Sequence, residues 1–241
     1  MRNRLRTLLP RFGLRTLLLA VAVCGIGLAW LGNLIRDVHC QRQILDGAFS
    51  RGYGVTVDDR VTRWMHQRLG MNWALALRAL DYVSMERRTT AVRGKDFEAL
   101  SGLRYKRLSL NRCLVTDGEF IHLKPFSGLK RFDAQVTGLG DKAIQHLSQF
   151  EGLEDMDIQG TKVTVDGIPH LTRLKRLRTA ILISTPLRDR SVASLRSMKQ
   201  LRYLFVHGTS ITPDDVAELR LALPDCDVDD SSACRYPPHF D

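Results

Sequence analysis

The chain has 241 residues, of which 44% are hydrophobic, and it carries a formal net charge of +10 at pH 7. This length allows one domain, or one domain with an anchor. Residues 1–15 contain five arginines and no acidic residue, so half of the net charge lies there. Because the other basic residues do not form a compact patch interleaved with aromatic residues, the composition argues against a nucleic-acid partner.

Residues 16–35 contain no charged side chain and directly follow this basic tail. A helix of this length spans about 30 Å, the thickness of the hydrocarbon layer. The positive-inside rule then places the N-terminus in the cytoplasm and all later residues beyond the cytoplasmic (inner) membrane. We expect a retained single-pass anchor in the lipid bilayer. Two alternatives, a cleaved signal peptide and a lipid anchor at Cys24, deliver the rest of the chain to the same compartment.

Residues 36–95 lack an internal period. They begin with an amphipathic stretch, which predicts a juxtamembrane helix. Residues 54–59 then predict a short strand and turn, residues 60–78 a helix, and residues 80–85 an alternating strand. We expect this region to cover the open N-terminal end of the array that follows, as terminal caps of repeat proteins do.

Residues 96–223 carry an apolar pattern with a period of 24 residues. Leucine recurs at one phase of this pattern, at Leu123, Leu147, Leu171, Leu195 and Leu219. The copies follow the spacing L-x-x-L-x-x-L-x-x-L-x-L-x-x-T-x-L. A fixed period of this length indicates a solenoid of stacked units.

This spacing resembles the leucine-rich repeat, with about five units present. The resemblance implies an α/β fold in which a curved parallel sheet, here of roughly six strands, has helical segments on its convex side. Where many family members have Asn or Cys after the strand, this chain has Cys113, Thr137, Thr161, Thr185 and Thr209. A Thr hydroxyl replaces only part of the hydrogen bonding of an Asn amide, so we expect the same turn with fewer bonds. The order of basic tail, apolar span, short helix, Val-x-Val strand and repeats also resembles bacterial membrane-anchored leucine-rich-repeat proteins.

Helix starts and the end of the array have their own signals. Residues 116–119 have the form of a capping box, and Thr212 followed by Pro213 predicts an N-cap with proline at the first helical position. Residues 224–241 break the repeat and predict a C-terminal cap and tail, in which Cys226 and Cys234 could pair.

The sequence indicates no enzymatic centre. His122, His146 and His170 share one phase of the repeat. We interpret them as a solvent-facing column, because no cysteine joins it and a zinc site usually has four ligands. The common catalytic and phosphate-binding motifs are missing from the sequence. We therefore predict no catalytic residue, no metal site and no cofactor.

The concave face of the sheet is the predicted binding surface. Strand residues that alternate with the core leucines point outward on this face. On two neighbouring strands these outward residues are apolar and lie side by side, and an exposed apolar cluster usually indicates a contact surface. The polar outward residues of the other strands would determine the position of the partner along the sheet. The predicted partner-binding residues are Ile181, Ile183, Tyr203, Phe205, Arg107, Arg131, Asp133, Asp155 and Asp157. In the alternative interpretation, the apolar residues of the C-terminal tail fold back over the apolar cluster.

Together these patterns predict a membrane-anchored repeat protein that binds another protein outside the cytoplasmic membrane. Two alternatives stay open. One is a structural envelope component without a discrete ligand, which packs or self-associates weakly. The other is a regulatory subunit that senses a peptide or a glycan. The sequence does not identify the partner.

Overall fold

The computed structural model describes residues 54–57, 80–85, 91–100, 105–124, 128–188 and 190–231. The predicted anchor at residues 16–35, the juxtamembrane helix, the helix expected at residues 60–78 and the tail after residue 231 lie outside these ranges. Within the ranges, no helix has the length and apolar character needed to cross a membrane.

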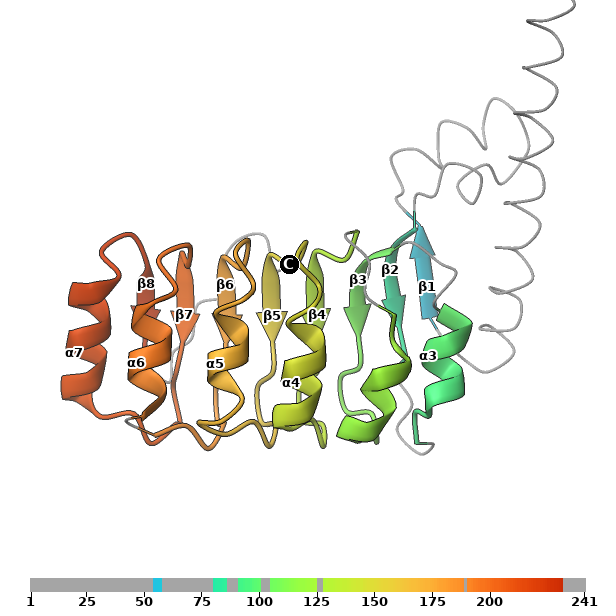
Figure 1. Cartoon of the computed structure of the whole chain (residues 1–241), viewed down its shortest axis with the longest axis horizontal. Helices are drawn as coiled ribbons and strands as arrows, with labels where there is room; N and C mark the ends of the chain where they lie inside the picture. The colour runs from blue at the N-terminus through green and yellow to red at the C-terminus, as the bar shows by residue number, and fades with distance from the viewer. Residues whose placement is uncertain are drawn as a thin grey trace, which may run out of the picture. The chain divides into compact units, whose positions relative to one another are not determined.

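The described strands form one sheet in which spatial order follows chain order (Figure 1). The first two strands pair antiparallel, and every later neighbouring pair is parallel. The strands are β1 (Gly54–Val57), β2 (Leu80–Ser84), β3 (Tyr105–Ser109), β4 (Arg131–Asp133), β5 (Asp155–Asp157), β6 (Thr179–Ile181), β7 (Tyr203–Phe205) and β8 (Asp227–Asp229). The sheet is therefore larger than the roughly six strands expected, because β1 and β2 extend it although they lack the 24-residue period.

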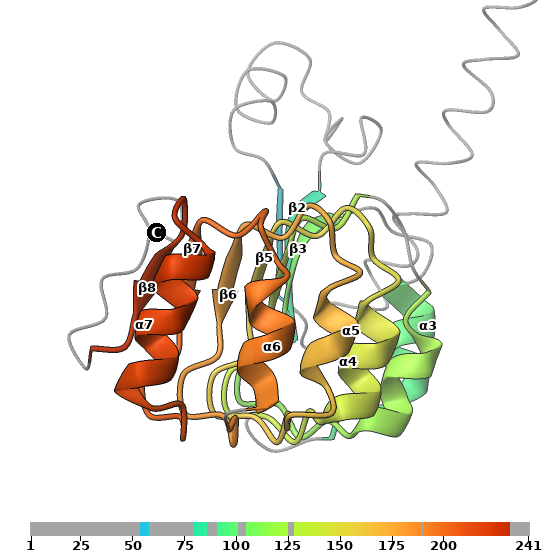
Figure 2. The ribbon, with the colours of Figure 1, turned by 60° about the vertical axis from the view of Figure 1, so that its left-hand side comes forward.

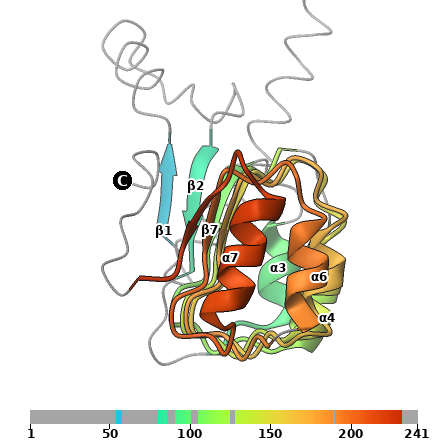
Figure 3. The same cartoon turned by 90° about the vertical axis from the view of Figure 1, so that its left-hand side faces the viewer.

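The helical segments of the described ranges lie on one face of the sheet (Figures 1 and 2). They are α3 (Gly94–Leu100), the 3-10 helix η1 (Asp117–His122), α4 (Asp141–Leu147), α5 (Ile168–Leu171), α6 (Arg190–Arg196) and α7 (Pro213–Ala222). An end view of the repeats shows the helices on one side of the strands (Figure 3). We call the other side of the sheet, the concave face of the prediction, the open face.

The core lies between the strands and the helices, and it is built from the repeated apolar phases. The recurring leucines at positions 123, 147, 171, 195 and 219 are all buried, as the period predicted. Near the N-terminal end of the repeats, Phe120 contacts Phe97 and Phe132, with ring centroids 5.3 and 6.0 Å apart. The strand register also follows the period, since Arg131 pairs with Arg107 and Asp155, each 24 residues away.

Each repeat turns after its strand at a residue with left-handed backbone conformation. This position is occupied by Arg112, Val136, Gly160, Ser184 and Gly208, with φ between 54° and 69°. At the second of these turns, the Val136 N–H donates to the Gln159 carbonyl of the following repeat at 2.8 Å. The left-handed conformation thus directs the backbone N–H of the turn residue toward the following repeat. Glycine adopts it without steric cost, whereas a β-branched residue does not.

The threonines of the next turn position close each turn locally. The hydroxyls of Thr137, Thr161 and Thr209 donate to the carbonyl three residues earlier at 3.0, 2.7 and 2.7 Å. Cys113, at the same phase, instead places its sulfur 2.9 Å from the Met85 carbonyl in the preceding strand segment. Each threonine therefore stabilises its own turn.

The capping box predicted at residues 116–119 and the N-cap predicted at Thr212 have different outcomes. At the start of α7 the predicted N-cap is confirmed and is part of a full capping box: the Asp215 N–H donates to the Thr212 hydroxyl at 3.2 Å, and the Thr212 N–H donates to the Asp215 carboxylate at 2.9 Å. The box predicted at Thr116 is wrong, because that side chain does not cap η1.

The acidic residues near Thr116 instead bond to neighbouring repeats. The Glu119 carboxylate accepts from the Gly94 N–H, and the Asp117 carboxylate accepts from the Gly140 N–H at 2.6 Å. These long-range bonds replace the local cap that the sequence spacing predicted.

Candidate partner-binding surface

The polar half of the open face, on β4 and β5, is an internal hydrogen-bond network. The Arg131 Nε donates to both carboxylate oxygens of Asp133, each at 3.0 Å. The Asp157 carboxylate accepts from the Gln135 side-chain amide at 2.6 Å and from the Gln159 N–H at 3.1 Å. Both aspartates are buried. The expectation that these two side chains are exposed on the open face is therefore wrong, and their contact with a partner stays a prediction.

Burial dominates the electrostatics of these two aspartates. It raises the pKa of Asp157 to about 6, although the hydrogen bonds from Gln159 and Gln135 act in the opposite direction. Burial also raises the pKa of Asp133, and the nearby Arg131 guanidinium opposes that shift. A carboxylate loses hydration when it is enclosed, which favours its neutral form.

The apolar half of the open face, on β6 and β7, is also more enclosed than predicted. Ile181, Ile183 and Phe205 form a cluster separate from the main core, with exposed fractions of 0%, 6% and 3%. The expectation that these three side chains are exposed is wrong. Strand alternation determines the direction in which a side chain points but not whether its neighbours cover it. Tyr203 packs against the cluster and stays partly exposed. The alternative of a covering C-terminal tail concerns residues outside the described ranges.

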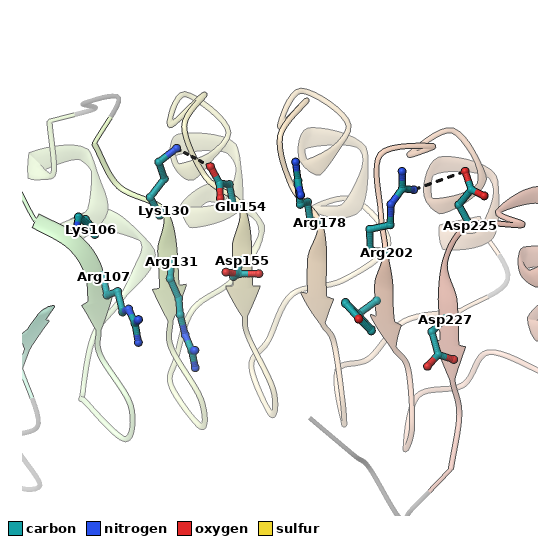
Figure 4. A pocket seen from close by; sticks show the side chains of 11 residues that line it. Lys106, Arg107, Lys130, Arg131, Glu154, Asp155, Arg178, Arg202, Asp225 and Asp227 are labelled. Carbon is teal, nitrogen blue, oxygen red and sulfur yellow. Dashed lines mark hydrogen bonds and ion pairs between the residues drawn. The ribbon is translucent and has the colours of Figure 1, made fainter. Parts of the chain in front are cut away.

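A groove runs along the edge of the open face where the strands begin (Figure 4). It has a volume of about 960 Å³, and β3 to β8 or the residues just before them supply its walls. The lining residues are Lys106, Arg107, Lys130, Arg131, Glu154, Asp155, Arg178, Arg202, Tyr203, Asp225 and Asp227. The groove thus brings together four of the predicted binding residues: Arg107, Arg131, Asp155 and Tyr203.

Two ion pairs cross between neighbouring repeats in this groove. The Lys130 Nζ lies 2.5 Å from the Glu154 carboxylate, and the Arg202 guanidinium lies 3.8 Å from the Asp225 carboxylate (Figure 4). These residues are partly or well exposed, so each pair contributes little to stability. Their charges are accessible to a partner.

Strand alternation did not predict most of the cations of this groove, because it identifies only the outward positions within each strand. Lys106, Lys130, Glu154, Arg178 and Arg202 share one phase, immediately before those positions. A charged residue in five successive copies at one phase was the signal that could have identified this edge.

The other candidate side chains have structural contacts. His122 Nδ1 lies 2.9 Å from the Glu98 carboxylate, and His146 Nε2 donates to the Leu123 carbonyl at 2.6 Å. The described residues include no group of three or more His, Cys, Asp or Glu side chains arranged to hold a metal ion. Burial raises the pKa of the Cys226 thiol to about 12, which disfavours the reactive thiolate. Its candidate disulfide partner, Cys234, lies outside the described residues.

Solved structures of leucine-rich-repeat proteins resemble this fold. One, from Leptospira interrogans, aligns with a TM-score of 0.50 at 20% identity over 66% of this chain and 39% of its own. The internalin InlF of Listeria monocytogenes aligns with a TM-score of 0.45 at 19% identity over 64% and 48% of the two chains. Internalin C2 of the same species aligns with a TM-score of 0.44 at 15% identity over 73% and 87%.

The chain spans less than half the length of the first two of these proteins. No family model and no curated protein matches the sequence. The parallel sheet with its 24-residue register, together with the similarity to the Leptospira structure, shows that the chain has a leucine-rich-repeat fold.

Proposed function

We propose that this chain is a membrane-anchored protein-interaction module that binds another protein along the groove of the open face. The observation that carries the proposal is the groove itself, which extends over six strands and is lined by charged side chains that the core does not need. Strands in a sheet are about 4.8 Å apart, so a groove crossing from β3 to β8 is about 24 Å long. That length suits an extended segment of a partner protein.

The mixture of charges supports a protein partner. Cations and carboxylates alternate along the groove, and such patterns provide specificity for a partner with the complementary order. Of the described residues that line the groove, Tyr203 alone is aromatic. Because glycan sites typically present several aromatic surfaces for stacking, a glycan sensor is a weaker alternative. A structural envelope component without a discrete ligand is the other alternative.

The anchor and the location of the repeats belong to the same proposal. The uncharged residues 16–35 follow five arginines, an order that favours a single span with the N-terminus in the cytoplasm. The repeats would then lie on the extracytoplasmic side of the inner membrane.

Photo-crosslinking tests the binding surface. A photoreactive phenylalanine analogue at position 203 of the anchored full-length protein places the probe at the groove. It also avoids the disturbance that substitution of the buried Phe205 would cause. Position 221 on α7 is the control, since Leu221 is 85% exposed on the helical face. Capture of one distinct protein from position 203 but not from position 221 supports the proposal. Identical products from both positions, or only products within the chain, contradict it.

A second experiment tests the anchor and the topology in a bacterial host. Deletion of residues 1–35 is expected to move the protein from the membrane fraction to the soluble fraction. Protease added to intact spheroplasts is expected to digest the repeats of the full-length protein. If the repeats are cleaved only after the cells are lysed, the proposed location is wrong.

A further inference from the structure

We infer that the segment bound in the groove is an extended acidic stretch of the partner protein, held by Arg178 and Arg202. This inference rests on the proposed function and specifies the chemistry of its partner. It follows from the arrangement of cations at the starts of β6 and β7.

Arg178 and Arg202 occupy equivalent positions in neighbouring repeats. The Arg202 N–H donates to the Arg178 carbonyl at 2.7 Å, so the two backbones are directly paired. Both side chains are exposed. Figure 4 shows no dashed contact between Arg178 and the other residues drawn in the groove, whereas the Arg202 guanidinium lies 3.8 Å from the Asp225 carboxylate and donates to the Leu201 carbonyl at 3.2 Å. Like charges at paired positions repel each other. A bound carboxylate between them would relieve that repulsion.

A smaller cavity of about 470 Å³ enlarges the cationic surface at this point. Lys175 and Arg176 line it together with Arg178, Arg202, Gln200 and Glu154. Four of these six side chains are therefore cations and one is a carboxylate. Lys and Arg side chains clustered in this way provide charge-assisted hydrogen bonds to carboxylates.

The order of charges along the groove selects a protein segment over other anions. Cations line the groove at β3 and β4, carboxylates at β5, cations at the starts of β6 and β7, and carboxylates at β8. A phosphate backbone or an anionic membrane has uniform negative charge and would meet Glu154, Asp155, Asp225 and Asp227 unfavourably. A peptide can place acidic residues opposite the cations and other residues elsewhere. At about 3.3 Å per residue, roughly seven extended residues cover the groove.

The test uses the full-length protein in detergent micelles and fluorescence anisotropy with two labelled seven-residue peptides. One peptide carries glutamates at both ends and a lysine at its centre, and the other carries lysines in place of the glutamates. The test variant is R178E/R202E. Its charge reversal is compatible with the fold because Glu154 occupies the same phase of the repeat, immediately before β5. The control variant, K142E/K162E, makes the same charge change at exposed positions after the strand ends.

We expect R178E/R202E to weaken binding of the glutamate peptide at least about tenfold, which corresponds to a loss of about 1.4 kcal/mol. K142E/K162E is expected to change it less than about twofold. The lysine peptide is expected to bind R178E/R202E more tightly than the unsubstituted protein. This reversal of preference cannot result from unfolding, so it separates docking from loss of structure.

Three outcomes would overturn the inference. One is equal weakening by both double variants, which would indicate a general charge effect. Another is tighter binding of a single-stranded oligonucleotide than of the glutamate peptide, with the same sensitivity to R178E/R202E. Tighter binding of phosphatidylglycerol vesicles with that sensitivity is the third. If the position-203 probe captures the same protein from R178E/R202E as from the unsubstituted protein, the proposed function stands and the acidic segment is excluded.

Discussion

The two halves of the open face share a backbone and differ in chemistry. On β4 and β5, side chains form two hydrogen-bonded pairs, Arg131 with Asp133 and Gln135 with Asp157. On β6 and β7, apolar side chains occupy the equivalent positions, and accessible arginines lie beside them at the strand starts. The helical side of the sheet does not show this division, because the core leucines recur throughout the array.

The comparison shows that the repeat period constrains the two faces of the sheet differently. Core positions must fit between strands and helices, so they stay apolar in every copy. Open-face positions do not pack between the strands and the helices, so their chemistry can change from one repeat to the next. The chemistry of the proposed binding surface is therefore determined by the open-face residues that differ from one repeat to the next.

The largest expected effects come from two adjacent residues that point to opposite faces. Ile181 belongs to the open-face cluster and Leu182 to the core, and both are fully buried. We expect I181A and L182A each to lower the free energy of unfolding by about 3 kcal/mol, measured by urea denaturation. I121A is the control, because Ile121 is 71% exposed and should lose little. A cost near zero for I181A would show that the open-face cluster is not packed.

Removal of the cation from the polar half is expected to have a somewhat smaller effect. R131M leaves the buried Asp133 carboxylate without its bidentate partner. We expect a loss of about 2 kcal/mol at pH 7.5, because an enclosed charge would be uncompensated. The double variant R131M/D133N should recover most of this loss in the same urea experiment. If the double variant is as unstable as R131M, the ion pair does not explain the effect.

Acidification should stabilise the folded protein through Asp157 in the polar half, whereas the apolar half has no corresponding carboxylate in its cluster. The pKa of Asp157 is raised by burial to about 6 in the folded protein. The unfolded chain binds protons to this group only near pH 4. The folded protein therefore binds this proton more readily than the unfolded chain, so the free energy of unfolding increases as the pH falls through 6. This contribution is lost as the pH rises above 6. Between pH 7.5 and pH 5 we expect a contribution of about 1 kcal/mol. The difference between unsubstituted protein and D157N over this range measures it, and identical pH profiles would contradict it.

The smallest expected effect concerns the left-handed turn position. Val136 has a φ of 54° and is 59% exposed, so V136G removes backbone strain with little loss of burial. We expect stabilisation by up to about 1 kcal/mol. G208A should act in the opposite direction, since Gly208 has a φ of 69° and an added Cβ would lie 2.9 Å from the Ser184 hydroxyl oxygen. Thermal denaturation of both variants tests the pair, and equal shifts would refute the argument.

The sequence was sufficient for the features that depend on period alone. The recurring leucines located the core, and the 24-residue spacing predicted the register that pairs Arg131 with Asp155. Contacts between repeats could not be read in the same way. The Thr116 cap was wrong because Asp117 and Glu119 bond to neighbouring repeats, and no local spacing encodes those partners.

The candidate site was predicted only in part for a related reason. Alternation correctly placed Ile181, Asp157 and Arg131 on one face. Their accessibility depends on what packs over them, which alternation does not describe. Arg178 and Arg202 were missed because they lie just before the strands, where a period-2 pattern does not apply.

The backbone bonds between successive turns also have a mechanical consequence. Each left-handed turn residue from Arg112 to Ser184 donates to the following repeat, so neighbouring units are held by short local links. A pulling force applied to the end of the array at β8 would be carried by one such boundary at a time. Each rupture would release 24 residues, or about 80 Å of extended chain. The array would therefore lengthen in regular steps under tension instead of yielding at once.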